Sequence, residues 1–298
     1  MIQGTIIKGI AGFYYVKVEG KVYECKARGR FRKENITPLI GDRVMISVVD
    51  EIQYNSNEYS QGTVEEILKR TNKLIRPPVA NVDQGIVVFA VTYPEIHLDL
   101  LDRFLVMVEI EGIKPYIVLN KIDGSNLESY KYIVDGYSKS GYEVVCVSAK
   151  EKLNVDRIKE ILKDKTSFFA GPSGVGKSTL LNAIQPDLKL QTGEVSVKIK
   201  RGKHTTRHVE LLPLNQGGYV LDTPGFTSLQ FEEIDQNELR HYFPEFGRFE
   251  GKCKFNGCSH IHEPGCKVKE ALEKGEMFEL RYASYVTYYN QLKDIRRW

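Results

Sequence analysis

Long apolar runs are missing from this sequence. No segment approaches the roughly 18 consecutive apolar residues that a membrane-spanning helix needs. At the N-terminus, Lys8, Gly9 and Gly12 interrupt the apolar residues that a signal peptide would keep together. Repeats and low-complexity tracts are missing as well, which argues against a collagen-like or other low-complexity fibre. We therefore expect a cytoplasmic protein that does not bind membranes.

Cysteine is scarce, and neither sign of charge dominates. The number of cysteines, five, is odd, and we expect no secretion signal; both argue against a disulfide framework. The formal net charge is only +3, and the basic excess falls in residues 1–70 and 251–298. With 42% hydrophobic and 27% charged residues, the composition is that of a globular protein and not of a disordered chain. A length of 298 residues alone suggests two domains, and the motifs below raise this to three.

Residues 1–70 predict a small β-barrel. Segments rich in β-branched and aromatic residues are separated by Gly, Asn and Pro turns. Roughly five such strands fit an OB-fold, with an SH3-like barrel as the alternative. The segment 26–33 holds five basic residues and Phe31 but no acid. This favours a nucleic-acid-binding loop in which Phe31 stacks on bases over a merely solvated loop.

Residues 71–230 predict an α/β domain, and residues 231–298 a mostly helical C-terminal module. A proline pair in the segment 73–78 predicts a linker at the start of the α/β domain. Alternating strand and helix patterns are typical of βαβ units and a mostly parallel sheet. The expected strands are 85–91, 115–120, 142–148, 166–171, 208–214 and 218–222, and the expected helices are 98–111, 126–139 and 154–163.

The strongest motif is a complete phosphate-binding loop, G-x-x-x-x-G-K-[ST], between a predicted strand and a predicted helix. Its glycines let backbone N–H groups converge on phosphates at a helix N-terminus. Lys177 would bridge the β- and γ-phosphates, Ser178 would hold Mg²⁺, and Thr179 would reach the α-phosphate. The loop consists of Gly171, Pro172, Ser173, Gly174, Val175, Gly176, Lys177 and Ser178.

Two further loops, each directly after a predicted strand, point to a guanine nucleotide. In an N-K-x-D motif the Asp carboxylate accepts two hydrogen bonds that guanine donates and adenine cannot. The Asn either braces the loop or reaches the base, and the Lys stem covers the nucleotide face. An S-A-K motif presents a backbone N–H to guanine O6. The residues are Asn120, Lys121, Ile122 and Asp123 in the first loop, and Ser148, Ala149 and Lys150 in the second.

A D-x-x-G motif and a pair of threonines complete the expected magnesium site. Asp222 would lie near Mg²⁺, and the Gly225 N–H would contact the γ-phosphate. One of Thr205 and Thr206 would ligand Mg²⁺ when GTP is bound. The two threonines, together with Lys177, are the candidate catalytic residues.

The residue that would position the attacking water is not evident. Phe226 stands where a Gln would orient the water. We therefore expect slow hydrolysis until a partner orders the site, with His204 as a candidate helper.

The order of these motifs is rotated. The two base-recognition loops precede the phosphate loop, whereas an ordinary GTPase starts with the phosphate loop. Loops at one edge of a sheet can still meet, so the sequence predicts a circularly permuted GTPase. The D-x-x-G loop then leads directly into the C-terminal module, and its ordering by GTP could move that module.

A cluster of soft ligands near the C-terminus predicts a structural zinc site. Three cysteines and a histidine fall within 14 residues, and Cys₃His is a common closed, tetrahedral zinc set. Reduced thiols in a small core are the alternative, and His262 competes for the fourth position. The expected ligands are Cys253, Cys258, His260 and Cys266.

The region after the cluster predicts helices. Tyr282, Tyr285 and Tyr289 recur at helical spacing, which favours a packing stripe over an RNA-stacking surface.

Together these motifs resemble the ribosome-associated, circularly permuted GTPase family RsgA, also called YjeQ or YloQ. The resemblance spans the whole chain and rests on the OB-like start, the rotated loops and the Cys₃His set. It implies GTP hydrolysis stimulated by the small ribosomal subunit, binding to that subunit's rRNA, and release after hydrolysis. We expect a monomer with GTP or GDP, Mg²⁺ and one Zn²⁺. Two alternatives stay open: a P-loop ATPase or nucleotide kinase, and a non-hydrolysing, GTP-dependent RNA-binding scaffold.

Overall fold

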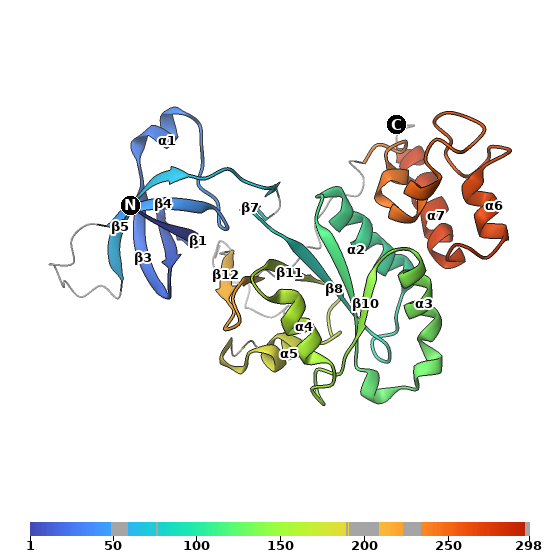
Figure 1. The fold of residues 1–298 in the computed structure, drawn as a ribbon, viewed down its shortest axis with the longest axis horizontal. Helices are drawn as coiled ribbons and strands as arrows, with labels where there is room; N and C mark the ends of the chain where they lie inside the picture. Colours follow the sequence, from blue (N-terminus) through green and yellow to red (C-terminus); the bar gives the residue numbers. More distant parts are fainter. Residues whose placement is uncertain (49–58, 76, 189, 191–208, 223–233, 296–298) are drawn as a thin grey trace. The chain divides into compact units, whose positions relative to one another are not determined.

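The computed structural model describes residues 1–48, 59–75, 77–188, 190, 209–222 and 234–295 (Figure 1). The chain forms two compact units. The first comprises Met1–Gln84, Lys159–Phe168 and Val195–Phe226, and the second comprises Gly85–Ile158, Phe169–Glu194 and Thr227–Trp298. Each unit is therefore assembled from three separate stretches of sequence.

The first unit begins with a closed five-stranded barrel, as expected. Its strands pair in the cyclic order β1-β2-β3-β5-β4, and β4 pairs back onto β1. All these pairings are antiparallel except that of β3 with β5. Alternating residues point inward to a core that includes Ile6, Val16 and Val64. The strands are β1 (Ile2–Ile10), β2 (Phe13–Val18), β3 (Lys21–Ala27), β4 (Arg43–Val48) and β5 (Ser60–Ile67).

The prediction that Phe31 stacks on bases is wrong for this structure. Phe31 lies on the short helix α1 (Gly29–Lys33), and its side chain is only 5% exposed because it packs in the barrel core. Arg28, on the same segment, forms an ion pair with Glu65 at 2.6 Å. The side chains of Lys26, Arg28, Arg30 and Lys33 are exposed, whereas the aromatic ring of Phe31 stabilises the barrel.

The expected linker at 73–78 is shorter and more ordered than its prolines suggest. Strand β6 (Lys73–Leu74), at the start of this segment, pairs antiparallel with β7 (Val79–Ala80), which directly follows the segment. The Ala80 N–H donates to the Ile40 carbonyl at 2.8 Å, and the side chain of Asn81 donates to the Gly41 carbonyl at 2.8 Å. The hairpin of β6 and β7 is therefore attached to the segment before β4 by one backbone and one side-chain hydrogen bond.

Three further strands belong wholly or mainly to the first unit. Strand β11 (Thr166–Ala170) pairs parallel with β13 (Tyr219–Asp222), which pairs antiparallel with β12 (Glu210–Pro213). Strand β12 also meets β1, where Lys8 and Glu210 form an ion pair at 3.1 Å. These strands match the patterns predicted at 166–171, 208–214 and 218–222.

The second unit contains the strands and helices that carry the base-recognition and phosphate-binding loops. Every residue of β8 is buried, and β9 pairs parallel with β10. Such fully apolar strands belong in a sheet covered on both faces. The elements that lie wholly or mainly in this unit are β8 (Gln84–Ala90), α2 (Leu98–Ile110), β9 (Lys114–Asn120), α3 (Lys131–Lys139), β10 (Glu143–Cys146) and α5 (Lys177–Ile184), and helix α4 (Val155–Leu162) is divided between the two units.

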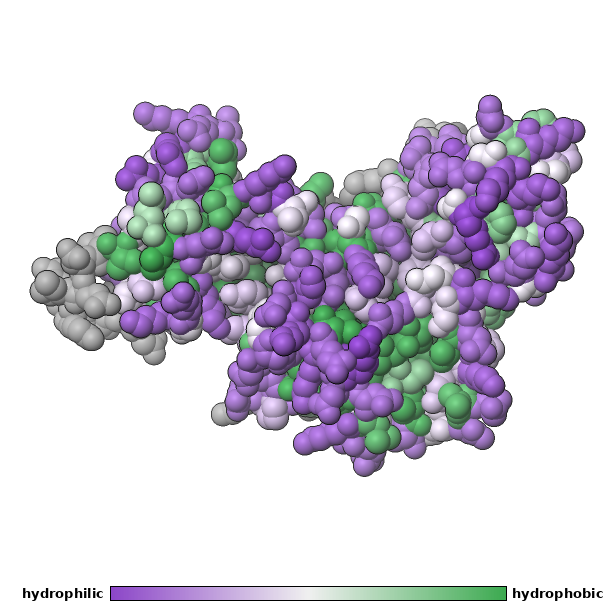
Figure 2. Space-filling model, viewed as in Figure 1, coloured by the Kyte–Doolittle hydropathy of each residue, from purple (hydrophilic) through white to green (hydrophobic). Residues whose placement is uncertain are grey.

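The C-terminal module is helical, as predicted. It contains η5 (Leu239–Tyr242), η6 (Pro244–Phe249), α6 (Lys267–Glu273) and α7 (Glu279–Ile295) around an aromatic core. Tyr285 is 1% exposed and packs against Phe243 and Phe246, so the tyrosine stripe of α7 is a packing stripe. Hydrophilic residues cover most of the visible surface of this module (Figure 2). Within the described residues, no helix is both long and apolar enough to cross a bilayer.

Candidate functional site: three loops and a thiol cluster

The phosphate-binding loop joins β11 to α5, as its motif requires. Gly171 has a φ of +132°, and a Cβ there would lie 2.1 Å from the Val88 carbonyl oxygen, so no other residue fits. The Lys177 ammonium donates to the carbonyls of Gly171 and Pro172 at 2.8 and 2.7 Å. Burial lowers the pKa of Lys177. The lysine is thus folded back over its own loop, at the N-terminus of α5, where anions are favoured.

Asn120 joins all three loops. Its side chain is almost fully buried, at 1% exposure. Its amide N–H donates to the Val175 carbonyl in the phosphate loop at 2.9 Å, and its amide oxygen accepts from the Ala149 N–H at 3.1 Å. Of the two roles open to this residue, the structure has the bracing one. The close fit also explains Gly176, where a Cβ would lie 2.4 Å from the Asn120 amide nitrogen.

Lys121 ties the same loop to the phosphate loop from the other side. It adopts a left-handed backbone conformation, with a φ of +65°. Its ammonium donates to the Gly174 carbonyl at 2.8 Å and to the Tyr93 carbonyl at 2.6 Å. The lysine stem therefore lies beside the phosphate loop and fixes the segment after β8 to it.

Asp123 is held ready as an acceptor. The Ser148 hydroxyl donates to its carboxylate and, by stabilising the ionised form, lowers the pKa of Asp123. The same Ser148 oxygen accepts from the Glu151 N–H at 3.1 Å, which fixes the orientation of the serine. The exposed Asp123 carboxylate is thus ionised and aimed by its neighbour.

These groups surround a cavity of about 320 Å³, large enough for a small polar ligand. The structure brings the predicted base-recognition and phosphate loops together here. Sequence reasoning missed Thr92 and Gly124, although Thr92 comes soon after the buried strand β8, where a strand-end rule would have found it. The lining residues are Thr92, Asn120, Lys121, Asp123, Gly124, Ala149, Lys150, Gly176 and Thr179.

The other predicted catalytic groups and two predicted nucleotide-binding groups lie outside the described residues. These are His204, Thr205, Thr206, the side chain of Asp222, and Gly225. Asp222 is the last residue of β13, so the D-x-x-G motif begins at a strand end.

The predicted thiol cluster is assembled in the C-terminal module. One ligand atom from each residue lies within 4.8 Å of the others, a set that fits a tetrahedral structural zinc. His260 Nδ1 lies 3.6 Å from Cys253 Sγ and 3.4 Å from Cys266 Sγ. His262 is exposed and outside the group, so His260 takes the fourth position. The members are Cys253, Cys258, His260 and Cys266.

Tyrosines of α7 hold the ligand-bearing loop. The Tyr282 hydroxyl donates to the His260 carbonyl at 2.7 Å, and the Tyr285 hydroxyl donates to the Ser259 carbonyl at 2.6 Å. Glu263 accepts from the Ser259 N–H at 2.9 Å, which closes the loop. The predicted packing stripe thus also supports the thiol cluster, a role that its spacing alone did not reveal.

The loops and their rotated order along the chain define a circularly permuted P-loop GTPase. Family models agree: the RsgA GTPase model matches residues 67–232, and the RsgA N-terminal domain model matches residues 3–53. The Small ribosomal subunit biogenesis GTPase RsgA of Caldanaerobacter subterraneus subsp. tengcongensis is 50% identical over 293 residues, which cover 98% of this chain and 96% of that protein. The protein of the same name from Alkaliphilus metalliredigens is 49% identical over the full length of both chains.

Solved structures give the same result. The crystal structure of YloQ, described as a circularly permuted GTPase, has a TM-score of 0.81 and 41% identity and covers 99% of this chain and 96% of its own. The structure of YjeQ from Thermotoga maritima has a TM-score of 0.81 and 38% identity, with 98% of both chains covered. The chain therefore belongs to the RsgA family of small ribosomal subunit biogenesis GTPases.

Proposed function

We propose that the cavity between the three loops binds GTP and GDP, and that GTP is hydrolysed there. The observation that carries this proposal is the position of Asn120, which joins the base-recognition loops to the phosphate loop through two buried hydrogen bonds. A buried polar junction of this kind fixes both ends of one ligand site, the base end and the phosphate end. Membership of a GTPase family supports the same nucleotide.

Asp123 is the proposed guanine selector. Its carboxylate lines the cavity and stays ionised with the help of Ser148, so it can accept from both N1–H and the 2-amino group of guanine. Adenine offers no such pair of donors, and a carboxylate that a bound base covers without donating to it is left unsatisfied, which is costly. A P-loop ATPase has no use for this arrangement, which is why we favour the GTPase.

The phosphate end is assigned to the loop backbone and to Lys177. The ammonium leaves its loop carbonyls to contact the β- and γ-phosphates, whose charge replaces the partial charges of two carbonyl oxygens. We assign Mg²⁺ to Ser178, to one of Thr205 and Thr206, and to Asp222 through water. His204 remains the candidate that assists the attacking water, with Gly225 on the γ-phosphate.

We propose that the small ribosomal subunit and its rRNA are the partner that accelerates hydrolysis. We also propose that the protein acts in the cytoplasm and as a monomer. Support comes from the relatives named for small ribosomal subunit biogenesis. In this proposal residues 1–70 and 231–298 flank the GTPase region 71–230 and contact the subunit. The basic excess of residues 1–70 and of residues 251–298, the last part of the C-terminal region, favours a polyanion such as RNA.

Phosphate release from GTP, with and without purified small subunits, tests the proposal. We expect slow release alone and a large acceleration by the subunit, and no acceleration would contradict the proposed partner. The Asp123→Asn variant should lose GTP affinity and gain affinity for xanthosine triphosphate, because an amide donates to the 2-oxo group. Unchanged preference for GTP in that variant would contradict the assignment of Asp123.

A further inference from the structure

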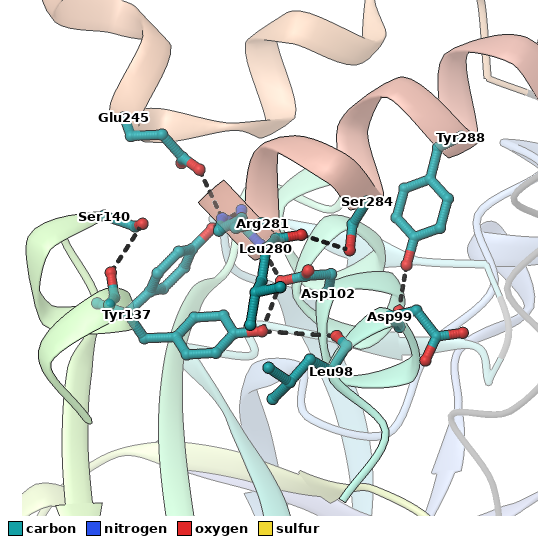
Figure 3. Close-up of polar contacts among 12 residues, drawn as sticks. Leu98, Asp99, Asp102, Tyr137, Ser140, Glu245, Leu280, Arg281, Ser284 and Tyr288 are labelled. Carbon is teal, nitrogen blue, oxygen red and sulfur yellow. Dashed lines mark hydrogen bonds and ion pairs between the residues drawn. The ribbon is translucent and has the colours of Figure 1, made fainter. Parts of the chain in front are cut away.

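A buried arginine connects the C-terminal module to the helix that follows the nucleotide-pocket wall. Arg281, on α7, is 0% exposed. Its guanidinium donates to Glu245 of η6 and to Asp102 of α2, each at 2.7 Å, and to the Tyr142 hydroxyl at 2.6 Å (Figure 3). It also lies over the rings of Phe243 and Tyr142, at 4.5 and 4.8 Å. Each of the three guanidinium nitrogens therefore has a hydrogen-bond partner, and the partners belong to separate parts of the second unit.

The contact with α2 is reinforced on both sides. The Tyr137 hydroxyl of α3 donates to the same Asp102 oxygen at 2.8 Å. One turn earlier, the Tyr288 hydroxyl of α7 donates to the Asp99 carbonyl (Figure 3). Helix α7 thus contacts the first two turns of α2, at the N-terminal end of α2.

The start of α2 is continuous with the wall of the nucleotide pocket. Thr92 lines the pocket, and the Tyr93 carbonyl accepts from Lys121, which also donates to Gly174 of the phosphate loop. Only four residues separate Tyr93 from Leu98, the first residue of α2. A shift of α2 along its axis would therefore move the wall, and a shift of the wall would move α2.

We propose that Arg281 is a positioning residue of the nucleotide site: through Asp102 it fixes α2 and the Thr92–Tyr93 wall, and so couples nucleotide binding to docking of the C-terminal module on α2. The inference rests on the proposed nucleotide pocket. Coupling of this kind is reciprocal, so a nucleotide that stabilises the wall must also stabilise the docked module. It is a separate route from the D-x-x-G loop that leads into the module along the chain.

The arrangement of charges decides which variants can test this. Arg281 serves two buried carboxylates, so its removal alone would leave both without a counter-charge and could unfold the module. The triple variant Arg281→Met, Asp102→Asn, Glu245→Gln removes all three charges together. Tyr288→Phe removes the hydroxyl contact with α2 and leaves the buried ion pairs of Arg281 in place.

The matched control is a contact between the same module and a different helix. Lys139 of α3 donates to the Gly275 carbonyl. Lys139→Met therefore weakens docking without touching α2, and it should leave the coupling intact. Zinc content of every variant confirms that the thiol cluster is formed.

The measurement is hydrogen exchange of the α7 amides in the full chain, with and without saturating GDP, beside the GDP dissociation constant. In the wild-type chain we expect GDP to lower the hydrogen-exchange rate of the α7 amides at least about fivefold, which is the low end of the coupling typically found between two sites. The triple variant should lose this effect and bind GDP about fivefold more weakly, and Tyr288→Phe should reduce the effect. Lys139→Met should keep it.

The results separate the two proposals. If the wild-type chain binds no guanine nucleotide, the proposed function and this inference fail together. If GDP binds but leaves α7 exchange unchanged, only the inference fails. It fails as well if the triple variant and Tyr288→Phe keep the full effect, or if Lys139→Met abolishes it to the same degree.

Discussion

Replacement of Asn120 by Ala should weaken both the fold of the second unit and its nucleotide site. The side chain satisfies the Val175 carbonyl and the Ala149 N–H, which lie in two different loops. A buried backbone group left without a partner costs about 1–3 kcal/mol. Two such groups give a loss of about 2–6 kcal/mol in the free energy of unfolding.

Two assays measure the loss. Thermal unfolding should show a Tm lower by at least about 4 °C, at about 2–4 °C for each kcal/mol in a unit of this size. A fluorescent GDP analogue should bind at least roughly 30-fold more weakly if the nucleotide must pull the loops together, because about 1.4 kcal/mol is a factor of ten. The affinity for GDP and for xanthosine diphosphate should fall in parallel, unlike in Asp123→Asn, since the junction does not touch the base.

The control is Asn126→Ala. Asn126 is exposed, accepts from the Glu128 N–H at 3.3 Å in the turn that follows the N-K-x-D loop, and does not line the cavity. Its loss should leave GDP affinity unchanged. If Asn120→Ala keeps both the wild-type Tm and a GDP affinity within about twofold, the argument from buried unpaired groups is refuted.

Three further predictions follow from single contacts. Cys266→Ser should reduce bound zinc and loosen the C-terminal module, because a small helical module gains folding energy from its metal. The control His262→Gln, at an exposed residue, should retain zinc. Equal zinc content of the two variants by atomic absorption would contradict this prediction. Gly171→Ala should abolish measurable GDP binding, since its Cβ would lie 2.1 Å from a carbonyl of β8, and wild-type affinity would show that the strand yields. Ser148→Ala should return the lowered pKa of Asp123 toward its ordinary value. The carboxylate must be ionised to accept from guanine, so GDP affinity is present above that pKa and should be lost at a higher pH in the variant than in the wild-type chain on acidification; identical pH profiles would contradict the role of Ser148.

Local patterns predicted most of the secondary structure and the site. The strand predicted at 85–91 and the helix predicted at 98–111 match β8 and α2 within a residue, because fully apolar and amphipathic stretches leave little choice. The phosphate loop, the N-K-x-D loop and the thiol cluster were found because their chemistry requires fixed spacing. The structure then selected His260 over His262, which spacing left open.

Features that depend on distant contacts were not predicted. Phe31 has five basic residues beside it in sequence, which suggests an exposed ring, yet the ring packs in the barrel interior. Arg281 belongs to an ordinary helical pattern, and nothing near it in sequence indicates that it is buried with Asp102, 179 residues away. Burial of a charge depends on partners that only the fold brings together.

The rotated order of the motifs also has a consequence during synthesis. Asn120 waits for Val175, 55 residues further along the chain, before its junction can form. At about 5–20 residues per second, this gap corresponds to roughly 3–11 s of translation. During that interval the N-K-x-D loop exists without the phosphate loop. GTP therefore cannot join the two ends of its site, or act as a folding template for the residues already made, until Ser178 has been added and 178 of the 298 residues are complete.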